Sequence, residues 1–416
     1  MPGPAEGAAP PSLWELARVY LRISLLGFGG PNAHLALMLD EVVERRRWLS
    51  RERFLELMAV TNLLPGPNSS EVAIHVGYTQ RGWRGALVTG LTFLLPTFVI
   101  VTALSALYFR YGTLPRVELL FWGLQPVIVA VVISAGLKIG RAGVRTGTQA
   151  ALAVLGGVVS FGSGRLIIGA MALGGLLTWW MGRGRGEAGP GGDGGTPPDG
   201  RATRPRGDAR EARPHDPDPQ RPDRGRVPSL VLLPLALGGG TAGLLGSVFW
   251  THLWIGSVLF GGGYVLVALL EPYAVGELGW LTAAQFLDGV ALTQAVPGPI
   301  STLSAFVGYA AAGVPGAILG TAGIYLPAFA GVLLAAPRLE RLRETAGVQD
   351  ALEGVVAVAA GAVLGVGASL VVEGVRDPAA ALLAGAALLL GVWKQVPALW
   401  LVGGGLAAGL VRVAIG

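Results

Sequence analysis

Residues 63–78 read LLPGPNSSEVAIHVGY and residues 295–309 read AVPGPISTLSAFVGY, so one Pro-Gly-Pro interruption occurs twice in the chain. The same offset of 232 residues relates three further pairs: Phe28-Gly29-Gly30 with Phe260-Gly261-Gly262, Trp48-Leu49 with Trp280-Leu281, and Phe54-Leu55 with Phe286-Leu287. Shared spacing over so many glycine, proline and tryptophan positions indicates an internal repeat. The sequence therefore predicts two homologous halves.

Both interruptions lie in long apolar surroundings. Of the 416 residues, 52% are hydrophobic and 14% are charged, whereas soluble domains carry about 25% charged residues. Four runs lack Asp, Glu, Lys and Arg: Gly85–Phe109, Leu119–Leu137, Gly289–Pro337 and Gly354–Val372. A spanning helix needs roughly 20 apolar residues, and in lipid the backbone must satisfy its own hydrogen bonds. The sequence predicts an all-α polytopic membrane protein with broken or re-entrant helices.

The composition also excludes several classes of function. The chain has no cysteine, and its four histidines, at positions 34, 75, 215 and 252, are scattered. We therefore expect neither a metal site nor a cofactor. The formal net charge of +5 comes largely from loop arginines, which stand where a topology signal would place them, so nucleic-acid binding is not expected. No nucleophile, di-aspartate or metal constellation favours an intramembrane enzyme.

The repeat and the local composition divide the chain into four segments. We expect a disordered tail over 1–11, a first repeat over 12–182, a disordered linker over 183–227 and a second repeat over 228–416. The linker is rich in Gly, Pro, Arg and Asp and offers almost no apolar residue to bury. A regulatory or lipid-headgroup-binding role is the alternative interpretation of this linker.

The helices around the first interruption are short. Segments 52–64 and 68–80 hold 13 residues each, or about 20 Å of helix, which is too little to cross the bilayer. We expect a re-entrant hairpin with Pro65-Gly66-Pro67 at its tip, and an equivalent hairpin in the second half. If the second half is inverted, thirteen loop Lys and Arg residues fall inside and three outside. This asymmetry follows the positive-inside rule and predicts an inverted-topology repeat.

The two interruptions are the predicted substrate site. A helix that starts after a break presents free N–H groups and a positive dipole end, which suit an anion. Inverted-repeat carriers bind their substrates near the midplane at such breaks. The candidate residues are Gly66, Pro67, Asn68, Ser69, Ser70, Gly298, Pro299, Ser301 and Thr302. Asn68 and Ser301 are equally compatible with ordinary N-caps, and Asn68 with Glu71 fits a loose capping box.

Two glycine clusters and two amides complete the predicted binding residues. Gly29-Gly30 and Gly261-Gly262-Gly263 are either second breaks beside the same site or positions of close helix packing. Asn62 and Gln294 are repeat-equivalent, and each lies shortly before its Pro-Gly-Pro. We include both clusters and both amides in the candidate site.

Ionisable residues within apolar segments are candidates for proton coupling. Glu56 and Asp288 are repeat-equivalent positions before the two breaks. Glu71 and His75 lie one turn apart on one helix face and have no counterpart in the second half. They could carry a proton, or they could form a satisfied internal pair.

Together these motifs resemble a known family. FGGPNAHLALMLDEVVERRRWLSRERFLELMAVTNLLPGPNSSEVAIHVGYTQRGWRGAL (28–87) resembles the N-terminal signature of chromate ion transporters, and FGGGYVLVALLEP (260–272) with GWLTAAQFLDGVALTQAVPGPISTLSAFVGY (279–309) resembles that of their C-terminal half. The resemblance covers roughly 12–180 and 244–414. The family often has aspartate at the position of Glu56 and glutamine at the position of Asn62.

The resemblance implies a multi-pass carrier in the inner membrane of a bacterium or archaeon, which exports chromate, a sulfate mimic, from the cytoplasm. Short members of the family encode one half each and pair, which suits a two-repeat chain and leaves a homodimer possible. Carriers for sulfate, for another oxyanion or for an amino acid are the first alternative. A channel is disfavoured because paired broken helices suit alternating access better than a continuous pore.

Overall fold

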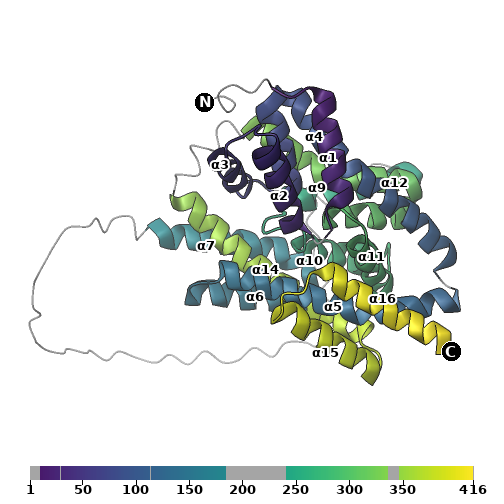
Figure 1. The fold of residues 1–416 in the computed structure, drawn as a ribbon. Helices are drawn as coiled ribbons and strands as arrows, with labels where there is room; N and C mark the ends of the chain where they lie inside the picture. The colour runs from purple at the N-terminus through teal and green to yellow at the C-terminus, as the bar shows by residue number, and fades with distance from the viewer. Residues whose placement is uncertain (1–9, 29, 113, 184–239, 336–345, 416) are drawn as a thin grey trace, which may run out of the picture.

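The computed structural model describes residues 10–28, 30–112, 114–183, 240–335 and 346–415 (Figure 1). All regular structure in these residues is helical. Five of the described helices are long and apolar enough to cross a membrane, over Asn68–Tyr111, Val117–Gly143, Ile300–Leu334, Gly347–Gly374 and Ala398–Ile415. The all-α polytopic membrane fold is thus confirmed. The predicted tail and linker fall almost entirely outside the described residues.

The first half begins with helices that carry their own caps. The hydroxyls of Ser12, Ser50 and Thr146 each accept a hydrogen bond from a backbone N–H in the first turn of a helix. In chain order the elements are α1 (Leu13–Leu26), α2 (Pro31–Met38), the π-helix η1 (Leu39–Arg45), α3 (Arg51–Thr61), α4 (Asn68–Tyr111), α5 (Pro115–Gly143), α6 (Gly147–Ser163), the short η2 (Gly164–Leu166) and α7 (Ile167–Arg183).

The second half runs through a similar series of elements. In chain order they are α9 (Thr241–Ser257), α10 (Val265–Glu271), the π-helix η3 (Pro272–Glu277), α11 (Ala283–Ala295), the short η4 (Ile300–Thr302), α12 (Leu303–Ala330), the π-helix η5 (Gly331–Ala335), α14 (Ala346–Gly374), α15 (Pro378–Val392) and α16 (Ala398–Ile415). Thr282 and Asp377 cap α11 and α15.

Unusual backbone conformations recur in the two halves at positions 231 residues apart, one residue less than the spacing of the two Pro-Gly-Pro motifs. Within α4, Arg81 (φ −140°, ψ 24°) and Gly82 (φ 59°, ψ −150°) interrupt the helix, and within α12, Ala312 (φ −148°, ψ 31°) and Gly313 (φ 61°, ψ −149°) do the same. The second residue of each pair is glycine because this positive φ is costly for a side chain. Each kink separates a short helix start, over 68–80 in α4, from a long helix.

The long helices of the two halves are interleaved (Figure 1). Helices α6 and α7 pack on α14 of the other half, and α15 and α16 pack on α5. Glycines allow these close crossings: a Cβ atom on Gly361 of α14 would lie 1.7 Å from the carbonyl oxygen of Ala153 in α6, and one on Gly123 of α5 would lie 2.2 Å from that of Gly405 in α16. Small residues have this role where membrane helices meet without a hydrophobic driving force.

The equivalent helices α3 and α11 begin at opposite ends of the long part of α4, which runs over 83–111. The start of α3 lies at the kink of α4, where Gln80 donates from Nε2 to the carbonyl oxygen of Trp48 (3.0 Å). The first turn of α11, at Ala284, instead lines a cavity together with Gly112 at the far end of α4. The two short helices therefore approach the interior of the protein from opposite sides.

Candidate functional site

Each Pro-Gly-Pro interruption lies against the glycine-rich break of the other half. The Gly66 N–H donates to the carbonyl oxygen of Leu259 (2.8 Å), and the Gly298 N–H donates to that of Gly27 (3.1 Å). Gly66 is equivalent to Gly298 and Gly27 to Leu259 at the 232-residue offset. The two hydrogen bonds are therefore the same contact made twice, once in each direction between the halves.

The long helices α4 and α12 pack directly against the two interruptions. Thr97 of α4 donates from Oγ1 to the carbonyl oxygen of Pro297 (2.8 Å), and a Cβ atom on Gly298 would lie 1.8 Å from that Oγ1. In the other direction, a Cβ atom on Gly66 would lie 3.0 Å from Cβ of Ala328 in α12. The helix behind Gly298 leaves no room for a side chain, and the contact behind Gly66 is tight. Both glycines also have a positive φ (152° at Gly66 and 120° at Gly298), which explains the Gly of each Pro-Gly-Pro.

A cavity of about 620 Å³ opens where the first interruption meets the second glycine cluster. Several elements contribute the polar side chains of its lining, which are Asn32, Thr61, Asn62, Asn68, Glu71, Ser134, Lys138, Tyr264 and Gln395. Four glycines contribute backbone to the lining: Gly66, Gly261, Gly262 and Gly263. We call this space the central cavity. Binding sites in proteins are typically concave spaces of this size with a few convergent polar groups.

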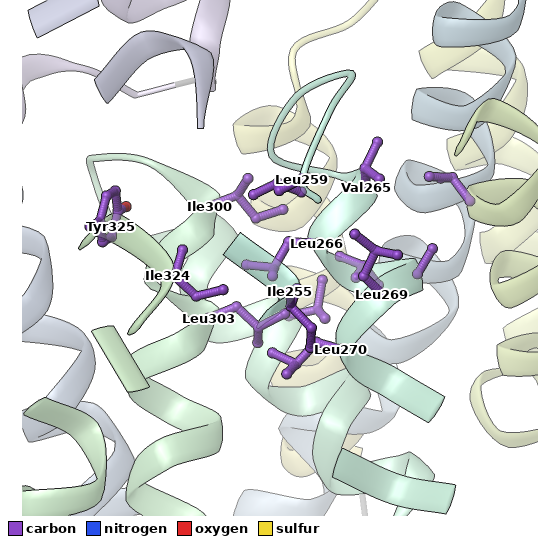
Figure 2. Packing of buried hydrophobic residues seen from close by; sticks show 14 of the residues in the cluster. Ile255, Leu259, Val265, Leu266, Leu269, Leu270, Ile300, Leu303, Ile324 and Tyr325 are labelled. Atoms are coloured by element: carbon purple, nitrogen blue, oxygen red, sulfur yellow. The ribbon is translucent and has the colours of Figure 1, made fainter. Parts of the chain in front are cut away.

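The glycine loop rests on a packed apolar core (Figure 2). Leu259 before the loop and Val265 after it are buried together with Ile300, which follows the second interruption. A Cβ atom on Gly263 would lie 2.4 Å from Cγ2 of Ile300. Positive φ angles at Gly261 (95°) and Gly262 (104°) turn the loop toward the cavity, so the rigid core fixes a backbone that a ligand can approach closely.

Several predicted residues meet at the central cavity: Asn62, Gly66, Asn68, Glu71, Gly261, Gly262 and Gly263. Asn68 donates from Nδ2 to Oδ1 of Asn62, which joins the two sides of the interruption. Gln294, the equivalent of Asn62, donates from Nε2 to the hydroxyl of Tyr264 (2.8 Å), which lines the cavity. Gly30 starts α2 with a positive φ, and Gly29 lies outside the described residues.

The predicted hydroxyl groups lie beside this cavity rather than on its lining. Ser69, Ser70, Ser301 and Thr302 are almost completely buried. Thr302 donates from Oγ1 to the carbonyl oxygen of Pro299 (2.8 Å), and Ser301 shares a hydrogen bond with the hydroxyl of Tyr325. These contacts hold the hydroxyls of Ser301 and Thr302 within the packed protein.

The N-cap interpretation of Asn68 and Ser301 is wrong. Pro67 precedes the first residue of α4, which is Asn68 itself, and no side chain caps this helix. The Asn68 amide instead spans the interruption to Asn62. Ser301 lies inside the turn η4 and bonds to a tyrosine rather than to the helix backbone.

The equivalent carboxylates Glu56 and Asp288 have different surroundings. Glu56 is half-exposed and forms an ion pair with Arg53 (2.8 Å) on the same helix. Asp288 is 6% exposed and accepts hydrogen bonds from the hydroxyl of Tyr108 (2.7 Å) and from Nε2 of Gln125 (2.8 Å). The repeat thus preserves an acidic position without preserving its environment.

Asp288 borders a second cavity of about 560 Å³ near the far end of α4. Its charged lining combines Glu118 and Asp288 with Arg376 and Arg412. Arg412 also contacts Asp377 (3.1 Å) and stacks over the ring of Trp122. This mixture of charges favours neither anions nor cations.

Lys138 of α5 is a site residue that sequence reasoning missed. The sequence places it in a basic loop cluster, where it counts as a topology signal, but its exposed side chain lines the central cavity. It is the cationic side chain among the described lining residues, and Glu71 is the acidic one. The periodicity of α5 could have placed Lys138 on the same face as Ser134 and Val131, one and two turns before it.

Comparisons with known proteins show the family to which the chain is similar. The family described as Chromate transporter matches residues 14–179 and again residues 246–410. The chain is 30% identical to a chromate transport protein of Pseudomonas aeruginosa, over 88% of this chain and 82% of that relative. It is 27% identical to a probable chromate transport protein of Synechococcus elongatus (85% and 83% covered) and to a chromate transport protein of Cupriavidus metallidurans (98% and 95% covered).

No solved structure matches the chain significantly. The relatives are named as transport proteins rather than as enzymes, and the apolar helices make this a multi-pass membrane protein. With the family matched twice along most of the sequence, the chain belongs to the chromate transporter family, a family of membrane transporters.

Proposed function

We propose that this chain exports chromate from the cytoplasm by alternating access and binds the anion in the central cavity. The observation that carries the proposal is the reciprocal contact between interruptions and glycine loops, Gly66 to Leu259 and Gly298 to Gly27. It brings one helix start and one glycine loop together around a polar space inside a membrane protein. Irregular backbone at that depth is tolerated where it lines a cavity.

The donors around the cavity fit a tetrahedral oxyanion. Asn32, Asn62 and Asn68 carry amide groups, the first turn of α4 points its dipole toward the space, and Lys138 supplies a positive charge. Sulfate has the same shape and charge as chromate, so the same groups would accept it. The buried hydroxyls of Ser69, Ser70, Ser301 and Thr302 would then shape the two helix starts from behind.

The proposal includes an inverted relation between the halves. The opposite starting ends of α3 and α11 support it, because parallel halves would place both starts at the same end of α4. Inverted repeats allow one half to open toward one side while the other half closes. Single cysteines can test this directly, since the native chain has none.

The decisive experiment is transport by the purified protein in liposomes. Chromate uptake that shows counterflow, with external sulfate accelerating the exit of labelled chromate, supports a carrier that accepts both anions. Uptake without counterflow favours a channel, and absence of uptake of any oxyanion refutes the proposal. A cysteine at Arg45 should react with an impermeant reagent from the cytoplasmic side, and one at its repeat equivalent Glu277 from the opposite side; reaction of both from the same side would refute the inverted topology.

A further inference from the structure

Glu71 is an unpaired carboxyl group in the wall of the proposed anion site. Its side chain is 1% exposed, and Oε1 has no hydrogen-bonding partner among the described residues. The group lies directly beneath the first interruption, since a Cβ atom on Gly66 would be 2.7 Å from Oε1. It is also the acidic side chain of the described cavity lining. A proposed anion site therefore contains a buried acid.

Among the described residues, no buried positive charge lies beside the carboxyl group of Glu71. From α5 the cavity receives Lys138, which is exposed at its edge, and from the loop before α10 it receives Tyr264. On α4 itself, His75 is buried one turn beyond Glu71. The lining residues from α2, α3, α14, α15 and α16 are neutral, and Ala328 packs from α12.

The second half has no acid at this place. At the 232-residue offset it has Leu303, which is fully buried. Leu303 follows the short turn η4, whereas Glu71 lies in the first turn of α4. An unpaired buried carboxyl group is costly, so its presence in the first half calls for a function at that place.

We propose that the central cavity binds the oxyanion together with one proton, which Glu71 carries; this inference rests on the function proposed above. An ionised carboxylate only accepts hydrogen bonds and repels an anion, whereas a protonated carboxyl group donates one. The proton comes from a hydronium ion of the solution: its O–H bond breaks as an O–H bond to a Glu71 oxygen forms, and a water molecule is left. Protonated Glu71 then serves as a donor to the anion beside the amides of Asn62 and Asn68.

This linkage has a quantitative consequence. At pH values where free Glu71 is ionised, each anion bound takes up one proton, so the dissociation constant rises about tenfold for each unit of pH. The relation is reciprocal: bound anion strengthens proton binding by the same factor. A site without the linkage has an affinity that is independent of pH over the same range.

Calorimetric titration of the purified full-length protein with chromate tests the inference. The titrations are run at several pH values at which chromate is fully deprotonated, and at each pH in two buffers of different ionisation enthalpy. The difference between buffers gives the protons taken up. We expect about one proton per chromate for the native protein. Glu71→Gln, which keeps the shape and the donor of the protonated acid, should bind chromate with a pH-independent affinity and without proton uptake.

Glu44→Gln is the matched control, because it removes an exposed carboxylate that pairs with Arg51 outside the cavity and should keep the native slope and proton count. Chromate binding without proton uptake by the native protein, or an unchanged slope in Glu71→Gln, overturns the inference and leaves the proposed function standing. No chromate binding at any pH overturns both. If Glu71→Gln does not fold, as judged by gel filtration, the proton count of the native protein decides alone.

Discussion

Replacing Gly298 with alanine tests whether the contact between the halves holds the interruption in place. The glycine has φ 120°, and a Cβ atom there would lie 1.8 Å from Oγ1 and 2.7 Å from Cβ of Thr97. The added methyl group would therefore displace either the interruption or α4. The displacement also endangers the hydrogen bonds from Thr97 to Pro297 and from Gly298 to Gly27.

The magnitude follows from three costs. Backbone strain at a positive φ costs about 1 to 3 kcal/mol, overpacking typically costs about 1 to 3 kcal/mol, and each lost hydrogen bond about 1 kcal/mol. Gly279→Ala is the matched control, because Gly279 also has a positive φ (60°) but no atom within 4 Å of the new Cβ. Gly279→Ala should therefore be destabilised by backbone strain only, without overpacking or loss of a hydrogen bond. We expect Gly298→Ala to be less stable than Gly279→Ala by about 3 to 5 kcal/mol, the sum of overpacking and two lost hydrogen bonds.

Thermal unfolding of both variants in the same detergent measures this difference, and chromate uptake in liposomes measures its consequence for transport. Gly298→Ala should melt well below the control and lose most of its uptake. Equal melting temperatures for the two variants would show that the interruption does not fit tightly against Thr97.

Three further comparisons, with five substitutions in all, test the cavity edge, the buried carboxylate and a helix crossing. Lys138→Gln should weaken chromate binding roughly tenfold, because a cation at a partly solvated cavity edge contributes about 1 to 2 kcal/mol to anion binding; an unchanged affinity in calorimetry would remove Lys138 from the site. Asp288→Asn should lower the free energy of unfolding by about 2 kcal/mol, because two donors lose a charged acceptor. Glu56→Gln should change it by less than about 1 kcal/mol, because Glu56 is half-exposed. Equal effects on thermal unfolding would contradict the difference in burial. Gly361→Ala should destabilise the protein, because the new methyl group lies in the crossing of α6 and α14. Gly403→Ala should stabilise its helix by up to about 1 kcal/mol, because no atom lies near the new Cβ. A stabilised Gly361→Ala would show that the helices do not cross as described.

Much of the fold can be predicted from the sequence because lipid imposes strong constraints. Uncharged runs reveal the spanning helices, and prolines with glycines reveal the interruptions at Pro65-Gly66-Pro67 and Pro297-Gly298-Pro299. The 232-residue offset predicts which positions correspond. The kinks at Gly82 and Gly313 occur at equivalent positions but have no proline-glycine-proline signal, so they become visible only in the backbone angles.

The candidate site is less predictable, because it is assembled from both halves. Sequence spacing indicates that Gly66 and Gly261 lie near breaks, but not that one break faces the other across the repeat. It also cannot distinguish a lining residue from a buried one: Asn68 and Ser69 are neighbours, yet only Asn68 lines the central cavity. The sequence predicts Lys138 as a loop charge that sets the topology. A lysine that sets the topology and a lysine that binds an anion cannot be told apart in the sequence alone.

A structure of the protein with chromate bound would show where the anion lies. We expect density for one tetrahedral anion in the central cavity, within hydrogen-bonding distance of the Asn68 amide and of the Gly261–Gly263 backbone, with Glu71 beside it. An anion bound instead between Arg376 and Arg412 in the second cavity, with the central cavity holding only water, would contradict it.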